Sequence, residues 1–536
     1  MDDADHRNTG PRGCPHYRAA VLSLGALGFA YGVAALVGLP LYADGAYYFF
    51  RLVLDGVPEI PNLRLAAVLP QLPALAATRL TEDVMALRHA FSLGYAALPV
   101  LSLLVCWLCV RHAAPALILF PALFLVANQV NLSGVSELLT SLYLAWPFVL
   151  LAGLHPHRGI TWIYGAALAP LLLLLHPLGF LLLLALAGLA GLNARLHPGI
   201  RSIWLGLMAA LGTAATLRLL WTLLGANEYE RSHGEADEAA YYLMADTPTK
   251  ALLLLLVLGL GLLLAFALDA RGKDRAIWLP RGLSLGIILL PLTGIALGAG
   301  WLTGEGIKLK IGAVYPLSLL LMGLAAILAA PLAARTGTTA DTRRQDLPWP
   351  PWLAACALAI VVATTAKSAA WWTATHGLMN ATASSELDCI PLGPQEPYAL
   401  QWPWMAIVDN WTAPMSALIF RGPWPVPLLL PKDGCQVLKE TGEARIHPWI
   451  LYPRSELEAR FGPLRSPASD AALDMSGQNP GSGLDAHPAA QQAQAVGGKG
   501  QDEGQDDTEG KSQGDVAHPV EPIAEPVDHV KDGIRQ

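Results

Sequence analysis

The chain has 536 residues, of which 54% are hydrophobic and only 14% charged, and its mean hydropathy is +0.42. The apolar residues come in long blocks, which excludes an ordinary soluble domain and is typical of a polytopic membrane protein. The net charge of −7 says little about partners, because residues 464–536 alone carry 13 acidic and 5 basic side chains. Nothing in the sequence indicates binding to nucleic acid.

At about 20 apolar residues per crossing, the sequence predicts an all-α membrane protein with eleven spans. They fall at residues 19–41, 90–110, 114–131, 136–154, 159–175, 177–193, 202–224, 250–268, 282–300, 312–334 and 352–372. The division of residues 159–193 follows from their length, and His176-Pro177 favours a turn there. The first block is long and lacks a small-x-small cleavage site, so it is interpreted as a retained span.

Arginine and lysine recur in alternate loops and predict the orientation. With residues 1–18 inside, five successive inner loops are basic, through Arg111, Arg158, Arg195 with Arg201, the group from Arg271 to Arg281, and Arg335 with Arg343 and Arg344. This positive-inside pattern predicts a multi-pass protein of a bacterial-type inner (plasma) membrane with its C-terminus outside. The long first loop, residues 42–89, then lies on the outer face.

The outer segments differ in character. Residues 46–55 and 63–80 are too short or too interrupted to span, and their aromatics and arginines predict interfacial helices. Residues 373–463 are rich in Trp and Pro and predict a small external domain, in which Cys389 and Cys435 are a disulfide pair if the compartment is oxidising. Residues 464–536 contain no Phe, Trp or Tyr and predict a disordered acidic tail.

Polar residues near the outer ends of spans are the functional candidates, because charge at that depth usually has a partner or a function. Asp44, in LYADGAYYFF, directly follows the first span, and is either a general base or a helix cap or partner of Arg51. Glu137 and Asn131 belong to NQVNLSGVSELL, where several amides and hydroxyls could line a cavity, although Ser136 and Glu137 could simply start a helix.

Three further positions carry basic side chains. His176 lies at an outer turn, where an interfacial histidine is the structural alternative to a functional one. Arg218, near the outer end of its span, could snorkel to headgroups or bind a phosphate. Lys308 and Lys310, in TGEGIKLKIG, violate the positive-inside pattern and are suited to a lipid phosphate, the alternative being a pair with Glu305.

Other chemistry is not indicated. The sequence has no GxxxxGK[ST] loop and no HExxH helix. Cys106 and Cys109 match CxxC within an apolar block, but without further ligands they are interpreted as packing residues, and no metal ligands are assigned.

Together these features resemble the GT-C superfamily of integral membrane glycosyltransferases, which use lipid-linked sugar donors. The likeness covers residues 19–372: an acid after the first span (Asp44), a first outer loop with two interfacial helices, many spans and a following outer domain. The sequence departs from part of the superfamily, because Asp55, eleven residues on, does not make a tight acidic pair with Asp44. A metal-independent mechanism is therefore expected, although a divalent metal is not excluded.

The resemblance implies an inverting transfer of sugar from a polyprenyl-phosphate donor to a glycan, lipid or protein acceptor of the cell envelope. Asp44 is then the general base. Lys308, Lys310 and Arg218 hold the donor phosphate, and Glu137, His176, Tyr47 and Asn131 orient substrate. Two alternatives stay open: a polysaccharide polymerase or ligase with lipid-diphosphate donors, and a transporter or flippase of lipid-linked sugars, which usually shows internal repeats and charges at midplane.

Overall fold

The computed structural model describes residues 15–61, 64–225, 309–335, 349–385, 387–392, 411–422, 424–431, 433–447 and 450–465. All of them belong to one compact unit, Met1–Asp470. Seven of the described helices are long and apolar enough to cross a membrane, which confirms an all-α, multi-pass membrane protein. The predicted spans at 250–268 and 282–300 lie outside the described residues, so the total of eleven stays a prediction.

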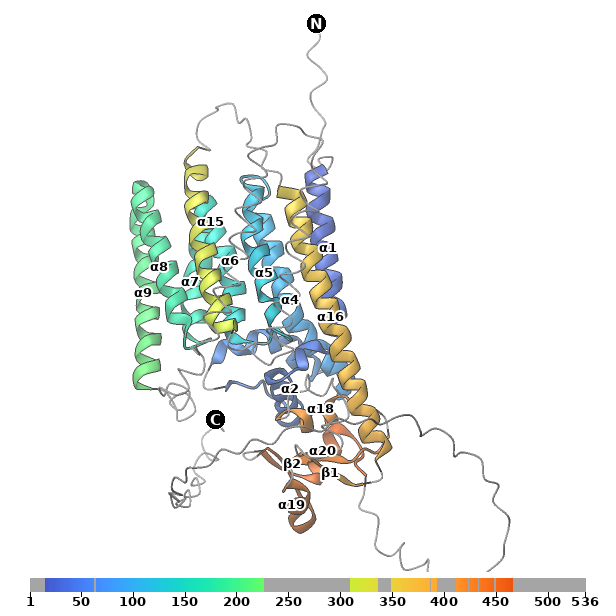
Figure 1. Ribbon diagram of the computed structural model, residues 1–536. Helices are drawn as coiled ribbons and strands as arrows, with labels where there is room; N and C mark the ends of the chain where they lie inside the picture. Colours follow the sequence, from blue (N-terminus) through green and yellow to red (C-terminus); the bar gives the residue numbers. More distant parts are fainter. Residues whose placement is uncertain are drawn as a thin grey trace, which may run out of the picture. The chain divides into compact units, whose positions relative to one another are not determined.

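The long helices run side by side in a bundle (Figure 1): α1 (Pro15–Leu36), α4 (Val84–Val110), α6 (Glu137–Leu154), α8 (Gly179–Leu196), α9 (Arg201–Leu224), α15 (Tyr315–Arg335) and α16 (Trp349–Ser384). Two shorter helices, α5 (Leu119–Ala127) and α7 (Gly159–Leu173), lie among them. Helix α1 packs on α4 and α16, α6 packs on α4 and α15, and α8 packs on α9. The loops after α1, α5 and α7 meet at one end of the bundle, which we call the α2 end.

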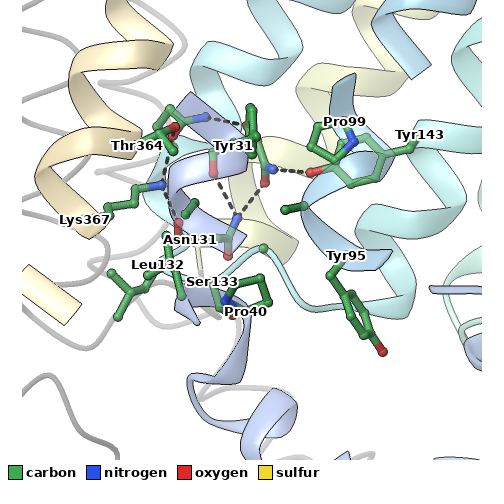
Figure 2. A pocket seen from close by; sticks show the side chains of 16 residues that line it. Tyr31, Pro40, Tyr95, Pro99, Asn131, Leu132, Ser133, Tyr143, Thr364 and Lys367 are labelled. Carbon is green, nitrogen blue, oxygen red and sulfur yellow. Dashed lines mark hydrogen bonds between the residues drawn. The ribbon is translucent and has the colours of Figure 1, made fainter. Parts of the chain in front are cut away.

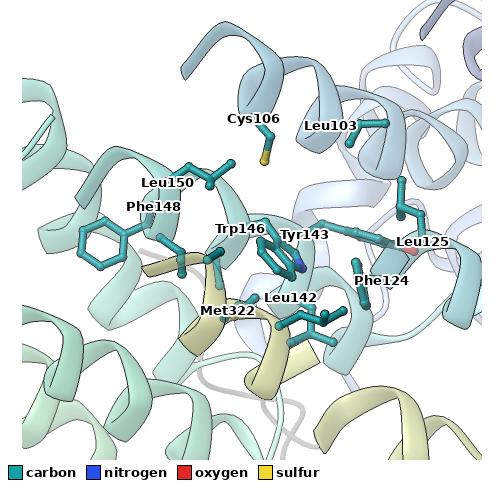
Figure 3. Close-up of a cluster of buried hydrophobic side chains, with 14 of the residues drawn as sticks. Leu103, Cys106, Phe124, Leu125, Leu142, Tyr143, Trp146, Phe148, Leu150 and Met322 are labelled. Carbon is teal, nitrogen blue, oxygen red and sulfur yellow. The ribbon is translucent and has the colours of Figure 1, made fainter. Parts of the chain in front are cut away.

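Helix α6 forms the centre of the bundle. Its Trp146, Phe148 and Leu150 are fully buried and pack with residues of α4, α5 and α15 (Figure 3). Cys106 and Cys109 are free and buried in the same cluster, in agreement with a packing role. At Gly153 an added Cβ would lie 2.6 Å from that of Ala329. Glycine is therefore needed where α6 and α15 approach most closely.

The first loop of the α2 end is helical, as predicted. It contains α2 (Asp44–Asp55), the 3-10 helix η4 (Leu65–Gln71) and α3 (Leu72–Ala77). Helix α2 is amphipathic: Asp44, Arg51 and Asp55 form an exposed to half-buried stripe at helical spacing, whereas most of its other residues, among them Ala46, Phe49, Phe50 and Val53, are buried. It ends at Gly56, whose φ of 67° suits the left-handed residue that closes a helix.

Helix α16 extends well beyond its predicted span of 352–372. It runs without a break over 36 residues, about 54 Å at 1.5 Å per residue, and is therefore longer than a bilayer core of about 30 Å requires. The predicted domain boundary at residue 373 falls inside this helix. The membrane bundle and the C-terminal region are thus joined by a continuous helix rather than by a linker.

The C-terminal region, residues 387–465, contains two small sheets. Strand β1 (Cys389–Leu392) pairs in parallel with β2 (Leu428–Pro431), and β3 (Glu443–His447) pairs antiparallel with β4 (Ile450–Pro453). The described part of this region also contains three helices: α18 (Ala413–Ile419), α19 (Gly434–Thr441) and α20 (Arg454–Phe461). Cys389 and Cys435 are joined by a disulfide with their Cα atoms 5.7 Å apart. Leu464 bridges to Val426, so the first residues of the predicted tail belong to this fold.

The C-terminal region shares one hydrophobic core with α2 and the end of α16. Phe50 of α2 stacks on Phe461 of α20, with ring centroids 5.3 Å apart, and packs edge-on against Tyr452. Arg51 hydrogen-bonds to the Tyr452 hydroxyl. Helix α2 is therefore held from two sides, by the bundle and by the C-terminal region.

Candidate active site

Asp44 occupies the first turn of α2, where a carboxylate is favoured by the helix dipole. The backbone around it is tightly constrained. Ala43 is the one non-glycine residue with positive φ in the described part of the chain, with φ 50° and ψ −122°, a conformation that costs an alanine about 1–3 kcal/mol. At Gly45 an added Cβ would come 1.8 Å from the Pro40 carbonyl oxygen. Asp44 itself is exposed.

The alternative in which Asp44 pairs with Arg51 is wrong. Arg51 Nη2 lies 2.9 Å from Asp55 Oδ2, and its Nε lies 3.4 Å from Glu59 Oε2. Asp55 is the last residue of α2 and Glu59 follows the helix, whereas Asp44 begins it. Asp55 is therefore occupied in a surface ion pair and is not a partner of Asp44.

Glu137 is the first residue of α6 and is buried, with 7% exposure. The Tyr48 hydroxyl donates to its Oε1 at 2.7 Å, and Arg64 Nη1 lies 3.5 Å from its Oε2. A buried carboxylate is stable when both its charge and its hydrogen bonds are satisfied in this way. The Glu137 side chain is thus held by two partners, in contrast to the exposed Asp44.

The two acids, 93 residues apart in sequence, act on the same tyrosine. Burial raises the pKa of Tyr48 well above its usual value of 10.0, and the charges of Glu137 and Asp44 raise it further. The charges of Glu137 and Asp44 also act on Tyr95, which is buried in α4. Because electrostatic effects of this kind need proximity, Asp44 and Glu137 lie around one site, and the Tyr48 phenol stays protonated to donate to Glu137.

Three cations gather around His176, in the turn between α7 and α8. Burial lowers the pKa of His176 well below its usual value of 6.5, and Arg64, Lys310 and Arg218 lower it further. The backbone N–H of Leu178 donates to Nδ1 at 3.2 Å. Neutral His176 therefore carries its proton on Nε2 and can donate it to an oxygen of a ligand.

Lys310 connects the acids and the cations. It is attracted by Asp44 and Glu137 and repelled by Arg64. It begins a short π-helical turn, Lys310–Val314, that leads into α15, and such turns are frequent at functional sites. Arg218 comes from α9, is 1% exposed and has its guanidinium 5.4 Å from the Trp221 ring. The charged residues at the α2 end thus come from four segments: the first loop, α6, α9 and the turn that leads into α15.

Electrostatic interactions link five of the predicted site residues at the α2 end: Asp44, Glu137, His176, Arg218 and Lys310. Lys308 and Glu305 lie outside the described residues. Tyr47 faces the C-terminal region instead, with its hydroxyl 3.4 Å from Glu59 and its ring 5.9 Å from that of Trp411. Sequence reasoning missed Arg64, Tyr48 and Tyr95. Arg64 and Tyr48 lie in the interfacial segments of the first loop, but only the fold singles them out from their neighbours.

Asn131 belongs to a second polar group, beside a cavity of about 30 Å³ (Figure 2). Its Nδ2 donates to Asn128 Oδ1 at 2.7 Å, and Asn128 Nδ2 donates to the Tyr143 hydroxyl at 2.7 Å. Lys367 of α16 donates to Asn131 O at 2.6 Å and to Gln129 Oε1 at 3.0 Å. Asn131 therefore holds α5 and α16 together, and its substrate-orienting role stays a prediction.

Within the described residues, no three His, Cys, Asp or Glu side chains are grouped as a metal site would require. The metal-independent chemistry expected from the sequence remains a prediction. The chain was compared with models of protein families, with curated proteins and with solved structures, and no match was found in any of the three comparisons.

Proposed function

We propose that the chain is an integral membrane glycosyltransferase that takes a sugar from a polyprenyl-phosphate donor at the outer face of the membrane. One observation carries this proposal. Lys310 interacts electrostatically with the exposed acid Asp44 and with the cation Arg64, and Arg64, Lys310 and Arg218 all act on His176. A base beside a phosphate-binding group is the pair of functions that the reaction needs.

The proposed reaction is a single displacement at the anomeric carbon. Asp44 takes the proton of an acceptor hydroxyl, and the acceptor oxygen forms a bond to the anomeric carbon. The bond from that carbon to the phosphate oxygen breaks, and the electron pair leaves with the lipid phosphate. Arg64, Lys310 and Arg218 stabilise the negative charge that this phosphate gains, because preorganised cations in a water-poor site act strongly on developing charge.

Glu137 and His176 have supporting roles in this proposal. Glu137 holds Arg64 and Tyr48 in place. His176 offers an Nε2–H donor without adding a fourth positive charge, since burial and then the surrounding cations lower its pKa and keep it neutral. The acceptor, whether a glycan, a lipid or a protein, remains open.

The test offers purified, lipid-reconstituted protein two donor classes: single sugars on polyprenyl monophosphate and glycans on polyprenyl diphosphate. Transfer from the monophosphate donors supports the proposal. Transfer from the diphosphate donors alone would identify a polymerase or ligase instead. Movement of either lipid across the vesicle bilayer without sugar transfer would identify a flippase.

A further inference from the structure

One face of α16 contacts the segments that lead into both acids of the candidate site. Lys367, with 3% exposure, donates to Asn131 O and Gln129 Oε1, as Figure 2 shows. Trp371, one turn later and 1% exposed, packs edge-on against Tyr42 with ring centroids 5.9 Å apart. Residues four apart lie on the same side of a helix, so both contacts come from one stripe of α16.

The two contacted segments lie just before the two acids in the sequence. Asn131 precedes Glu137 by six residues, and Tyr42 precedes Asp44 by two. The segments also approach each other, since an added Cβ at Gly45 would lie 3.4 Å from Val135 Cγ2. A shift of either segment against α16 would therefore change how Asp44 and Glu137 are arranged around Tyr48.

Helix packing alone does not explain a lysine at this position. Lys367 lies within a membrane-spanning helix, where a buried ammonium is costly and usually serves a function. Its partners in the described part of the chain are two neutral oxygens, without a carboxylate. These two hydrogen bonds hold the Gln129 side chain and the Asn131 backbone against α16.

We propose that Lys367 and Trp371 are positioning residues, which hold the two acid-bearing segments in register on one face of α16. Their part in catalysis rests on the proposed function, whereas their hold on the two segments does not. Helix α16 continues to Ser384 and enters the C-terminal core. The same helix therefore also ties the placement of the acids to the C-terminal region.

The first experiment measures backbone hydrogen exchange in the reconstituted full chain. Lys367→Met keeps the length of the side chain and removes both hydrogen bonds. We expect exchange across residues 131–137 to become about tenfold faster, while peptides of α9 are unchanged. Lys439→Met, at an exposed position of α19, is the matched control. Unchanged exchange at 131–137 in a folded Lys367→Met protein overturns the proposal.

The second experiment separates positioning from general packing. Trp371→Leu should speed exchange across residues 40–46, whereas Trp372→Leu, at a neighbouring residue with 49% exposure, should not.

In the transfer assay, Lys367→Met should lower kcat about tenfold or more with little change in the donor KM. Lys367→Gln, which keeps N–H donors, should recover part of the loss. Faster exchange with an unchanged kcat also overturns the positioning role. A parental protein without transfer activity refutes the proposed function, and the exchange result still decides whether α16 holds the two segments.

Discussion

At the scale of single residues, the site depends on how differently its charges are surrounded. Asp44 is exposed, whereas Glu137 is buried against Tyr48 and Arg64. In the proposed mechanism the exposed Asp44 takes the proton of the acceptor, and Glu137 holds Tyr48 and Arg64 in place. The sequence alone could not assign these roles, because both residues begin a helix at the end of a predicted span.

Lys310→Met removes a cation that interacts electrostatically with Asp44, Glu137 and Arg64. We expect the affinity for a polyprenyl-phosphate sugar to fall by about tenfold to a hundredfold, since a hydrogen bond to a charged group contributes about 1.5–3 kcal/mol. Binding is measured in detergent by native mass spectrometry. Lys439→Met, at an exposed position in the C-terminal region, should bind the lipid as the parent does. Equal affinities for both variants would remove Lys310 from the phosphate site.

His176 predicts a pH dependence of stability. Its pKa is lowered in the folded state, so the unfolded chain binds more protons below its usual value of 6.5 and stability falls as the pH falls. The melting temperature should therefore drop between about pH 7.5 and about pH 5.5. In His176→Gln this drop should be smaller. Parallel pH profiles for the two proteins would show that His176 is not held neutral.

At the scale of elements, the positions of the described long helices could be predicted, but the full length of α16 could not. Apolar blocks are a local signal, so the predicted spans at 90–110, 136–154 and 202–224 each correspond to a described helix. Helix α16 continues to Ser384 because residues 373–384 remain helical while packing against the C-terminal region, which hydropathy does not register. Lys367 was overlooked for the same reason, since one lysine barely changes the hydropathy of an otherwise apolar block.

Gly45→Ala tests the turn that presents Asp44. The new methyl group would collide with the Pro40 carbonyl oxygen, 1.8 Å from its ideal position, so the start of α2 must shift. We expect a lower melting temperature and loss of transfer activity. Gly25→Ala, in α1, meets nothing within 4 Å and should leave the protein as stable or slightly more stable, because alanine favours a helix by about 1 kcal/mol. Similar melting temperatures for the two variants would contradict the tight turn.

At the scale of the whole molecule, the bundle and the C-terminal region act as one body around α2. The shared core, the Phe50–Phe461 stack and the continuous α16 all lead to this conclusion. Sequence reasoning gave the C-terminal region its cysteine pair and its Trp-rich character, but not its contacts. Those contacts join residues about 400 positions apart, as between Arg51 and Tyr452, and no local pattern encodes such a pairing.

The same reason explains what was missed in the site. Asp44, Glu137, His176, Arg218 and Lys310 were selected one by one, from charge near the ends of spans. That they converge, and that Arg64 and Tyr48 join them, depends on how helices α2, α4, α6, α9 and α15 pack. The hypothesis of sugar transfer stays a proposal that needs a chemical test.

That test is the rate of sugar transfer from polyprenyl-monophosphate donors by purified, reconstituted Asp44→Asn protein, compared with the parent and with Asp55→Asn. Both changes replace a carboxylate by an amide of nearly the same shape within α2, but Asp55 is paired with Arg51 at the surface. We predict that Asp44→Asn lowers kcat by at least about a hundredfold, as expected for the loss of a general base, while Asp55→Asn keeps the parental rate. Transfer by Asp44→Asn at the parental rate would contradict the assignment of Asp44 as the base.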